Sequence, residues 1–176
     1  MNTAPTLMIN LASLINETSV GAPVCQVDVT HLATRIASPD QDGVIQGTSQ
    51  GIEVLFTEEA AISLIVDTEP FRVSPGMALA VRGDIAVTSN HTGIEGNPTE
   101  PLPELKIIEL NARIGDAFPL RELVDLPLQL GAEATDALNR VHDQLTFGEE
   151  SVPLPPGNLD ISRHVAAITL VATLLK

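Results

Sequence analysis

Aromatic residues and cysteine are scarce in this 176-residue sequence. It contains four Phe and no Trp or Tyr, so few side chains are available to stack against bases or sugar rings. The single cysteine, Cys25, cannot form an internal disulfide, which is typical of proteins in a reducing compartment. Because Cys25 lies in a segment of alternating polarity, we interpret it as a small buried residue rather than a reactive thiol.

Basic residues are also few. The chain has 9 Lys and Arg against 23 Asp and Glu, which gives a net charge of −14, and no Lys or Arg precedes Arg35. Proteins that bind nucleic acids contact the phosphate backbone through clustered Lys and Arg side chains. We therefore expect that this chain itself binds no nucleic acid.

Long apolar runs are missing as well. No run approaches the roughly 18–20 residues that are needed to span a bilayer. The N-terminal segment carries no basic residue before its apolar part, unlike a secretory signal peptide. These features predict a cytoplasmic protein that does not bind the membrane.

The four histidines, His31, His91, His142 and His164, fall on different predicted elements. A bound Fe, Mn or Zn ion needs several nitrogen or oxygen ligands in a fixed geometry, so we predict no metal site. The sequence contains no Gly-rich phosphate loop and no nucleophile motif. We therefore predict no cofactor and no catalytic residue.

The sequence does contain many short apolar runs separated by turn residues. In its central part these runs are residues 52–56, 61–66, 71–73, 77–81 and 85–88. Ser74-Pro75-Gly76 predicts a tight turn, because Pro presets φ at the second turn position and Gly accepts a positive φ at the third. Short strands at a spacing of 8–12 residues predict an antiparallel β-sandwich or β-barrel.

Beyond Asn111 the hydrophobic period changes from two residues to about 3.6. Residues 118–124 are predicted to form a short helix. Residues 132–147 are predicted to form an amphipathic helix with Leu138, Val141 and Leu145 on one face. The last predicted helix, residues 159–175, is apolar on several faces, so it must be buried against the domain or a second subunit.

These patterns together predict an α+β fold that is mainly β. A cupin-like antiparallel β-barrel or sandwich would occupy residues 1–112. A helical segment, residues 113–176, would pack on it as part of a single structural unit.

One part of the sequence, residues 65–90, resembles the core of the cupin-like N-terminal sensor domain of AraC-family transcriptional regulators. In this resemblance Ile65-Val66-Asp67 ends one strand, Phe71-Arg72-Val73 forms the next, and Ser74-Pro75-Gly76 supplies the turn. The resemblance extends over residues 24–176. It implies a ligand-sensing domain whose two C-terminal helices form a homodimer. The family's helix-turn-helix DNA-binding domain is not in the sequence, so we expect the native chain to continue beyond Lys176.

The resemblance also implies a small-molecule site in the mouth of the barrel, lined by residues 52–66 and 77–87. Arg72 and Arg82 flank the Ser74-Pro75-Gly76 turn, and His91 follows it, so we consider these three residues as ligand-binding candidates. A surface ion pair is the alternative interpretation of the two arginines. The predicted dimer interface consists of Leu138, Val141, Leu145, Val165, Ile168 and Ala172.

Two other functions remain open at this point. The first is a metal-free cupin-like enzyme that acts on a sugar or a small acid, with Glu58, Arg72 or His91 in its site. The second is a structural or assembly protein whose apolar last helix packs in a multimer. Glu58 and Glu59 are adjacent in a predicted turn, where a carboxylate pair is more often solvated than catalytic.

Overall fold

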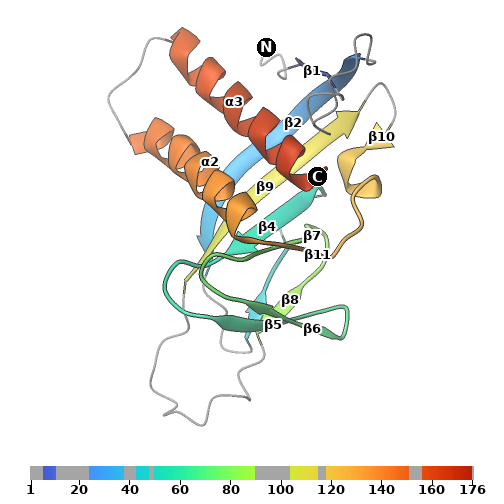
Figure 1. Cartoon of the computed structure of the whole chain (residues 1–176), viewed down its shortest axis with the longest axis vertical. Coiled ribbons are helices and arrows are strands. Elements are labelled where there is room, and N and C mark those ends of the chain that lie inside the picture. Colours follow the sequence, from blue (N-terminus) through green and yellow to red (C-terminus); the bar gives the residue numbers. More distant parts are fainter. Residues whose placement is uncertain are drawn as a thin grey trace.

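The computed structural model describes residues 6–10, 24–37, 43–47, 50–89, 104–114, 118–150 and 156–175. These residues form two antiparallel sheets and two long helices (Figure 1). The predicted α+β, mainly β class is thus confirmed.

The larger sheet consists of six strands in one path and a seventh strand beside it. In spatial order the path is β1 (Thr6–Asn10), β2 (Val24–Ala37), β9 (Leu105–Ile114), β4 (Ile52–Phe56), β7 (Ala78–Arg82) and β11 (Leu128–Leu130), and β10 (Phe118–Pro119) pairs with β9. The smaller sheet has the order β3 (Val44–Ile45), β8 (Val87–Ser89), β5 (Ile62–Val66) and β6 (Glu69–Val73). The helices are η2 (Leu120–Glu122, a 3-10 helix), α2 (Ala132–Glu150) and α3 (Pro156–Leu174).

Both faces of the larger sheet are covered. Helices α2 and α3 lie across one face (Figure 1), where Val54 and Phe56 of β4 join a core with Leu138 and Leu170 of the helices. The smaller sheet packs on the other face, where Leu55 of the same strand belongs to a second core. Because β4 is buried on both faces, four of its five residues are apolar. A strand with one exposed face would instead alternate apolar and polar residues.

The turns around the smaller sheet follow from local sequence. Gly76 has a φ of 81°, and the Met77 N–H donates to the Ser74 carbonyl oxygen at 2.8 Å, which confirms the predicted tight turn. The β5–β6 hairpin turns through Asp67 and Thr68, both with positive φ, as two-residue hairpin loops require. Pro70 lies in β6, an edge strand where its missing N–H is tolerated.

The predicted helix at residues 118–124 is wrong in its first part. Phe118 and Pro119 form strand β10 against β9, and Pro119 is extended, with φ −60° and ψ 133°. Only the three residues of η2 are helical. The next segment adds β11 to the larger sheet through pairing with β7. The division of the chain at residue 112 remains a prediction.

The face of α3 that this chain buries is not the face that carries Val165 and Ile168 of the predicted dimer interface. From residue 165 onward, where the side chains of α3 are described, the buried residues are Ala166, Ala167, Leu170, Val171 and Leu174. Val165 and Ile168 remain 48% and 39% exposed. An all-round apolar helix gives the hydrophobic period little power to select a face, so only the packing of α3 against the sheet decides it.

Candidate functional site

Two of the three ligand-binding candidates, Arg72 and Arg82, lie on different sheets. Arg72 is exposed on β6 of the smaller sheet, whereas Arg82 ends β7 of the larger sheet. His91 lies outside the described residues.

Arg82 forms an exposed ion pair, as the alternative interpretation proposed. Its Nε and a terminal guanidinium nitrogen donate to the two carboxylate oxygens of Asp84 at 3.2 and 3.1 Å. The hydrogen bond from Arg82 lowers the pKa of Asp84, and the same contact raises the pKa of Arg82. Glu58, a candidate residue of the alternative enzyme function, also forms an ion pair, since its carboxylate lies 2.8 Å from Lys106 Nζ.

Three of the six predicted interface residues need a correction. Leu138, Val141 and Leu145 are buried in the core between α2 and the larger sheet, with exposed fractions of 0, 1 and 6%. Their own chain covers them, so they are not available to a second copy. The predicted surface is reduced to Val165, Ile168 and the partly buried Ala172.

Part of the predicted lining of the barrel mouth is packed into the two cores. Val54, Leu55, Phe56, Leu64 and Leu79 are all fully buried within the two cores. The two cavities described below lie outside this packed interior.

An ionic network lies on the face of the larger sheet that the smaller sheet covers only in part. Arg35 of β2 donates from Nε to Glu109 Oε1 at 2.7 Å and from a terminal nitrogen to Glu53 Oε2 at 2.8 Å. The same nitrogen also donates to the Gln46 carbonyl oxygen at 3.1 Å. His31 Nε2 lies 3.0 Å from Glu109 Oε2. We call these four side chains, His31, Arg35, Glu53 and Glu109, the ionic network.

Exposure increases along this network. The side chains of Glu53 and Glu109 are only 3% and 10% exposed, whereas those of Arg35 and His31 reach 24% and 47%. Two buried carboxylates are costly unless they are paired and hydrogen-bonded, and one guanidinium serves both here. The arrangement therefore couples three strands electrostatically at the border of the smaller sheet.

Sequence reasoning missed this network. Arg35 is separated by 18 residues from Glu53 and by 74 from Glu109, so only the strand order β2-β9-β4 brings them together. The sequence does contain one local indication. Glu53 interrupts the apolar run of residues 52–56, and side chains two residues apart in a strand lie on the same face. Glu53 therefore shares its face with the buried Leu55.

A polar cavity of about 250 Å³ lies farther along the same strands. It is lined by Thr30, Gln50, Asn111, Arg113, Pro119 and Arg121. Residues Glu109, Asn111 and Arg113 alternate along β9 on the face that Leu105 and Ile107 share under the smaller sheet. The sheet surface thus changes from apolar to polar where its cover ends.

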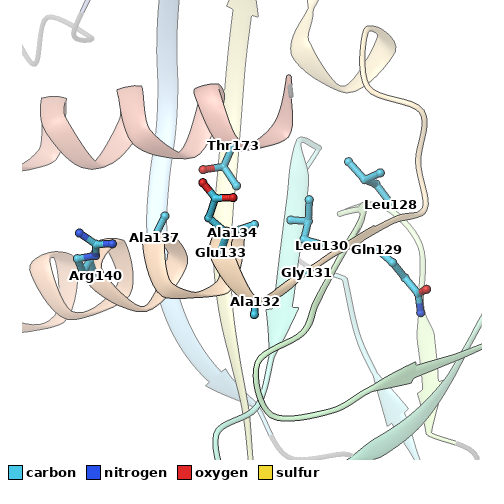
Figure 2. Close-up of a pocket in the computed structure, with 10 residues that line it drawn as sticks. All are labelled: Leu128, Gln129, Leu130, Gly131, Ala132, Glu133, Ala134, Ala137, Arg140 and Thr173. Carbon is cyan, nitrogen blue, oxygen red and sulfur yellow. The ribbon is translucent and has the colours of Figure 1, made fainter. Parts of the chain in front are cut away.

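A larger cavity of about 560 Å³ lies at the other edge of the sheet. It is bounded by edge strand β11, the first turns of α2 and the last turn of α3 (Figure 2). Its lining residues are Leu128, Gln129, Leu130, Gly131, Ala132, Glu133, Ala134, Ala137, Arg140 and Thr173. Figure 2 shows the Glu133 side chain rising from α2 toward the turn of α3 that carries Thr173. The larger cavity is therefore mainly apolar, with a few polar groups at its wall.

His142 is a buried titratable residue of α2 that faces the larger sheet. It is 5% exposed, and its ring packs edge-on against Phe56 with a centroid distance of 5.9 Å. Burial lowers the pKa of His142 and the positive charge of Lys106 adds to this effect, although Asp143 opposes it. His142 is thus favoured in its neutral form.

Two kinds of feature are absent from the described part of the chain. The described residues contain no group of three or more His, Cys, Asp or Glu side chains placed to hold a metal ion. None of the described helices is both long and apolar enough to cross a membrane.

Comparison with known proteins identifies no family, and solved structures of similar fold are found. No family model matches the sequence, and no curated protein matches it. Among solved structures, the fold is similar to that of the AraC-like transcriptional activator CuxR, with a TM-score of 0.48 and 9% sequence identity. The match covers 87% of this chain and 52% of that protein, so the chain spans about half of its length. A likeness of this degree does not establish membership of a family.

We expect that replacing Arg35 with Met destabilises the fold. The substitution keeps much of the side-chain volume but leaves two buried carboxylates without their guanidinium. Discounted for partial exposure, the free energy of unfolding should fall by roughly 2–4 kcal/mol, measured by urea denaturation. The matched control, Arg82→Met, removes an exposed pair and should cost much less. Equal losses in both variants would show that the ionic network stabilises the fold no more than an exposed ion pair does, which would contradict the prediction.

The lowered pKa of His142 predicts a pH-dependent stability. The unfolded chain takes up a proton near the usual value of 6.5, whereas the folded chain does so only at lower pH. The unfolded state then binds more protons, so the free energy of unfolding falls as the pH decreases below about 6.5. His142→Gln removes this contribution. The difference in unfolding free energy between the wild type and the variant, measured from pH 8 to pH 5, should therefore change with pH. A constant difference would contradict the assignment.

Proposed function

We propose that this chain is a ligand-sensing and dimerisation domain of an AraC-type transcriptional regulator, and that its ligand binds in the larger cavity. The observation that carries the proposal is the position of this cavity. One bound molecule would touch edge strand β11, the start of α2 and the end of α3 together (Figure 2). Ligand binding would thus act directly on the joint between the sheet and both helices.

The lining of the larger cavity suggests the chemistry of its ligand. A volume of about 560 Å³ falls within the range of sites for small organic molecules. Leu128, Leu130 and three alanines supply apolar surface, while Gln129, Glu133, Arg140 and Thr173 supply polar groups. The Thr173 hydroxyl donates to the Thr169 carbonyl oxygen at 2.7 Å, so it is left to act as an acceptor. We propose a mainly apolar small molecule that carries a hydrogen-bond donor.

The sensing mechanism would be a shift between two arrangements of the helices. A ligand changes such an equilibrium only if it binds one arrangement more tightly than the other. In the larger cavity the ligand would contact α2 and α3 at once, and these helices pack on each other and on the sheet. DNA would be bound by another domain, since the acidic composition of this chain opposes contact with phosphates.

The dimer would use the exposed face of α3. Val165 and Ile168 are large apolar side chains left 48% and 39% exposed beside the buried face of the helix. Ala172 continues this face by one turn. A second copy that covers these residues would remove apolar surface from water and place the two α3 helices together.

Filling the larger cavity tests the ligand proposal. The wild-type protein is screened against small metabolites by thermal shift, and the dissociation constants of the hits are measured by calorimetry. Ala137→Leu adds three carbons to the wall and should weaken binding at least about tenfold, because it takes up space that the ligand needs. Glu133→Gln should weaken the binding of ligands that carry a hydrogen-bond donor.

The matched control is Asp136→Asn on the same helix, which removes the same charge from an exposed residue outside the lining. It should leave the dissociation constant nearly unchanged. Hydrogen exchange in α2 and α3 should slow when the ligand is bound. Binding that is insensitive to Ala137→Leu, or that leaves the exchange of both helices unchanged, would contradict the proposed site.

A charge on the exposed face of α3 tests the dimer. Ile168→Asp should give a folded monomer in sedimentation velocity experiments, because an unpaired carboxylate would be buried in the interface. Leu123→Asp is the control, since Leu123 is a similarly exposed apolar residue elsewhere, with 49% of its surface exposed. A dimer that persists in Ile168→Asp would exclude this interface.

A further inference from the structure

We infer that the polar cavity is a binding site for a compact oxyanion, which is a phosphate or carboxylate group. Its wall is assembled from four separate parts of the chain, namely β2, the segment before β4, β9, and the β10–η2 segment. Two of the chain's nine basic residues, Arg113 and Arg121, line this one small space. Among the described residues of the lining, none is acidic.

Arg121 is held mainly by a neutral partner. One of its terminal nitrogens donates to the Gln50 carbonyl oxygen at 2.7 Å. Its acidic neighbours are farther away, with Asp84 Oδ2 at 3.5 Å and Glu122 Oε1 at 3.8 Å. Asp84 already accepts two shorter bonds from Arg82. In contrast to Arg35, which has carboxylate contacts of 2.7 and 2.8 Å, Arg121 is oriented without a close ion pair.

Arg113 enters the same wall from the neighbouring strand. It lies directly opposite Asp28 across the β2–β9 pair, a cross-strand arrangement that favours opposite charges. Asp28 is not part of the lining. The guanidinium group is the side chain best suited to oxyanions, because its planar donors match two oxygens at once.

Neutral donors complete the wall between the two arginines. Gln50 and Asn111 line the cavity, and the side-chain amide of each can donate through its NH₂ group. Thr30 is the extra residue of the bulge between Val29 and His31, and its hydroxyl donates to the Asn111 carbonyl oxygen at 3.2 Å. A β-bulge often redirects side chains next to a functional site, and this one fixes the backbone at Asn111.

The volume of the polar cavity limits the size of the ligand. About 250 Å³ is below the usual range for drug-sized molecules, so the cavity suits a phosphate, or a small acid with few carbon atoms. This inference goes beyond the proposed sensing function and shares no residue with the larger cavity. Either site can therefore fail without the other.

The test is a titration of the full chain with inorganic phosphate and, separately, with malonate. Chloride keeps the ionic strength constant, because general screening would otherwise mimic binding. Binding is followed by ¹H–¹⁵N NMR of the backbone and of the arginine Nε groups. We expect saturable shifts that centre on Asn111, Arg113 and Arg121.

Three charge-removing variants locate the site. Arg113→Gln and Arg121→Gln should each weaken the binding of the anion at least about tenfold, since each variant loses a charge-assisted hydrogen bond to it. Arg72→Gln removes the same charge from an exposed residue of β6 outside the lining and should leave the affinity nearly unchanged. Arg113 is exposed on the surface, so its variant keeps the test decisive if Arg121→Gln does not fold. Ala137→Leu, in the larger cavity, should bind the anion like the wild type.

The two anions distinguish the source of the oxyanion. Saturable binding of phosphate alone identifies a phosphate group, binding of malonate alone identifies a carboxylate, and binding of both supports the shared chemistry. The inference is overturned if neither anion gives saturable shifts at this cavity. It is also overturned if all three arginine variants weaken binding equally, because the effect would then follow from total charge.

Discussion

The larger sheet has to be covered on both faces, and the rest of the structure depends on this constraint. Its central strands carry apolar side chains at successive positions, so Val54 and Phe56 require one apolar layer and Leu55 requires another. Two helices supply the first layer and the smaller sheet supplies the second. The smaller sheet covers only part of its face, and β9 changes from Ile107 to Glu109 and Arg113 where that cover ends. The two cavities described above therefore lie at the margins of the packed interior.

Local chemistry explains which parts of the fold could be predicted. The turn at Ser74-Pro75-Gly76 and the strands around it depend on neighbouring residues, and the structure contains them. The buried face of α2 also follows from one clear period, through Leu138 and Val141. The face of α3 does not, because a helix that is apolar all round can pack in several orientations. The ionic network could not be predicted at all, since Arg35 meets Glu109 only through the pairing of β2 with β9.

The few basic side chains of this acidic protein serve different purposes, which their contact distances separate. Arg35 lies within 2.8 Å of two buried carboxylates, so most of its charge is used to stabilise the fold. Arg82 holds Asp84 at the surface, where solvent weakens the pair. Arg121 has its shortest bond to a carbonyl oxygen and no carboxylate closer than 3.5 Å among its recorded partners. An arginine that is positioned by a neutral group retains charge for an external anion.

The two cavities are connected by a short piece of chain, which raises the question of whether they communicate. Arg121 lines the polar cavity, and Leu128 lines the larger one only a few residues later. Between them, Val124 is 8% exposed and packs into the core beneath the helices, as does Leu120 just before Arg121. A well-packed core resists small displacements, so these two anchors hold the connecting segment at its start and its middle. An anion beside Arg121 would then leave Leu128 in place, and a ligand in the larger cavity would act on the helices rather than on the polar cavity.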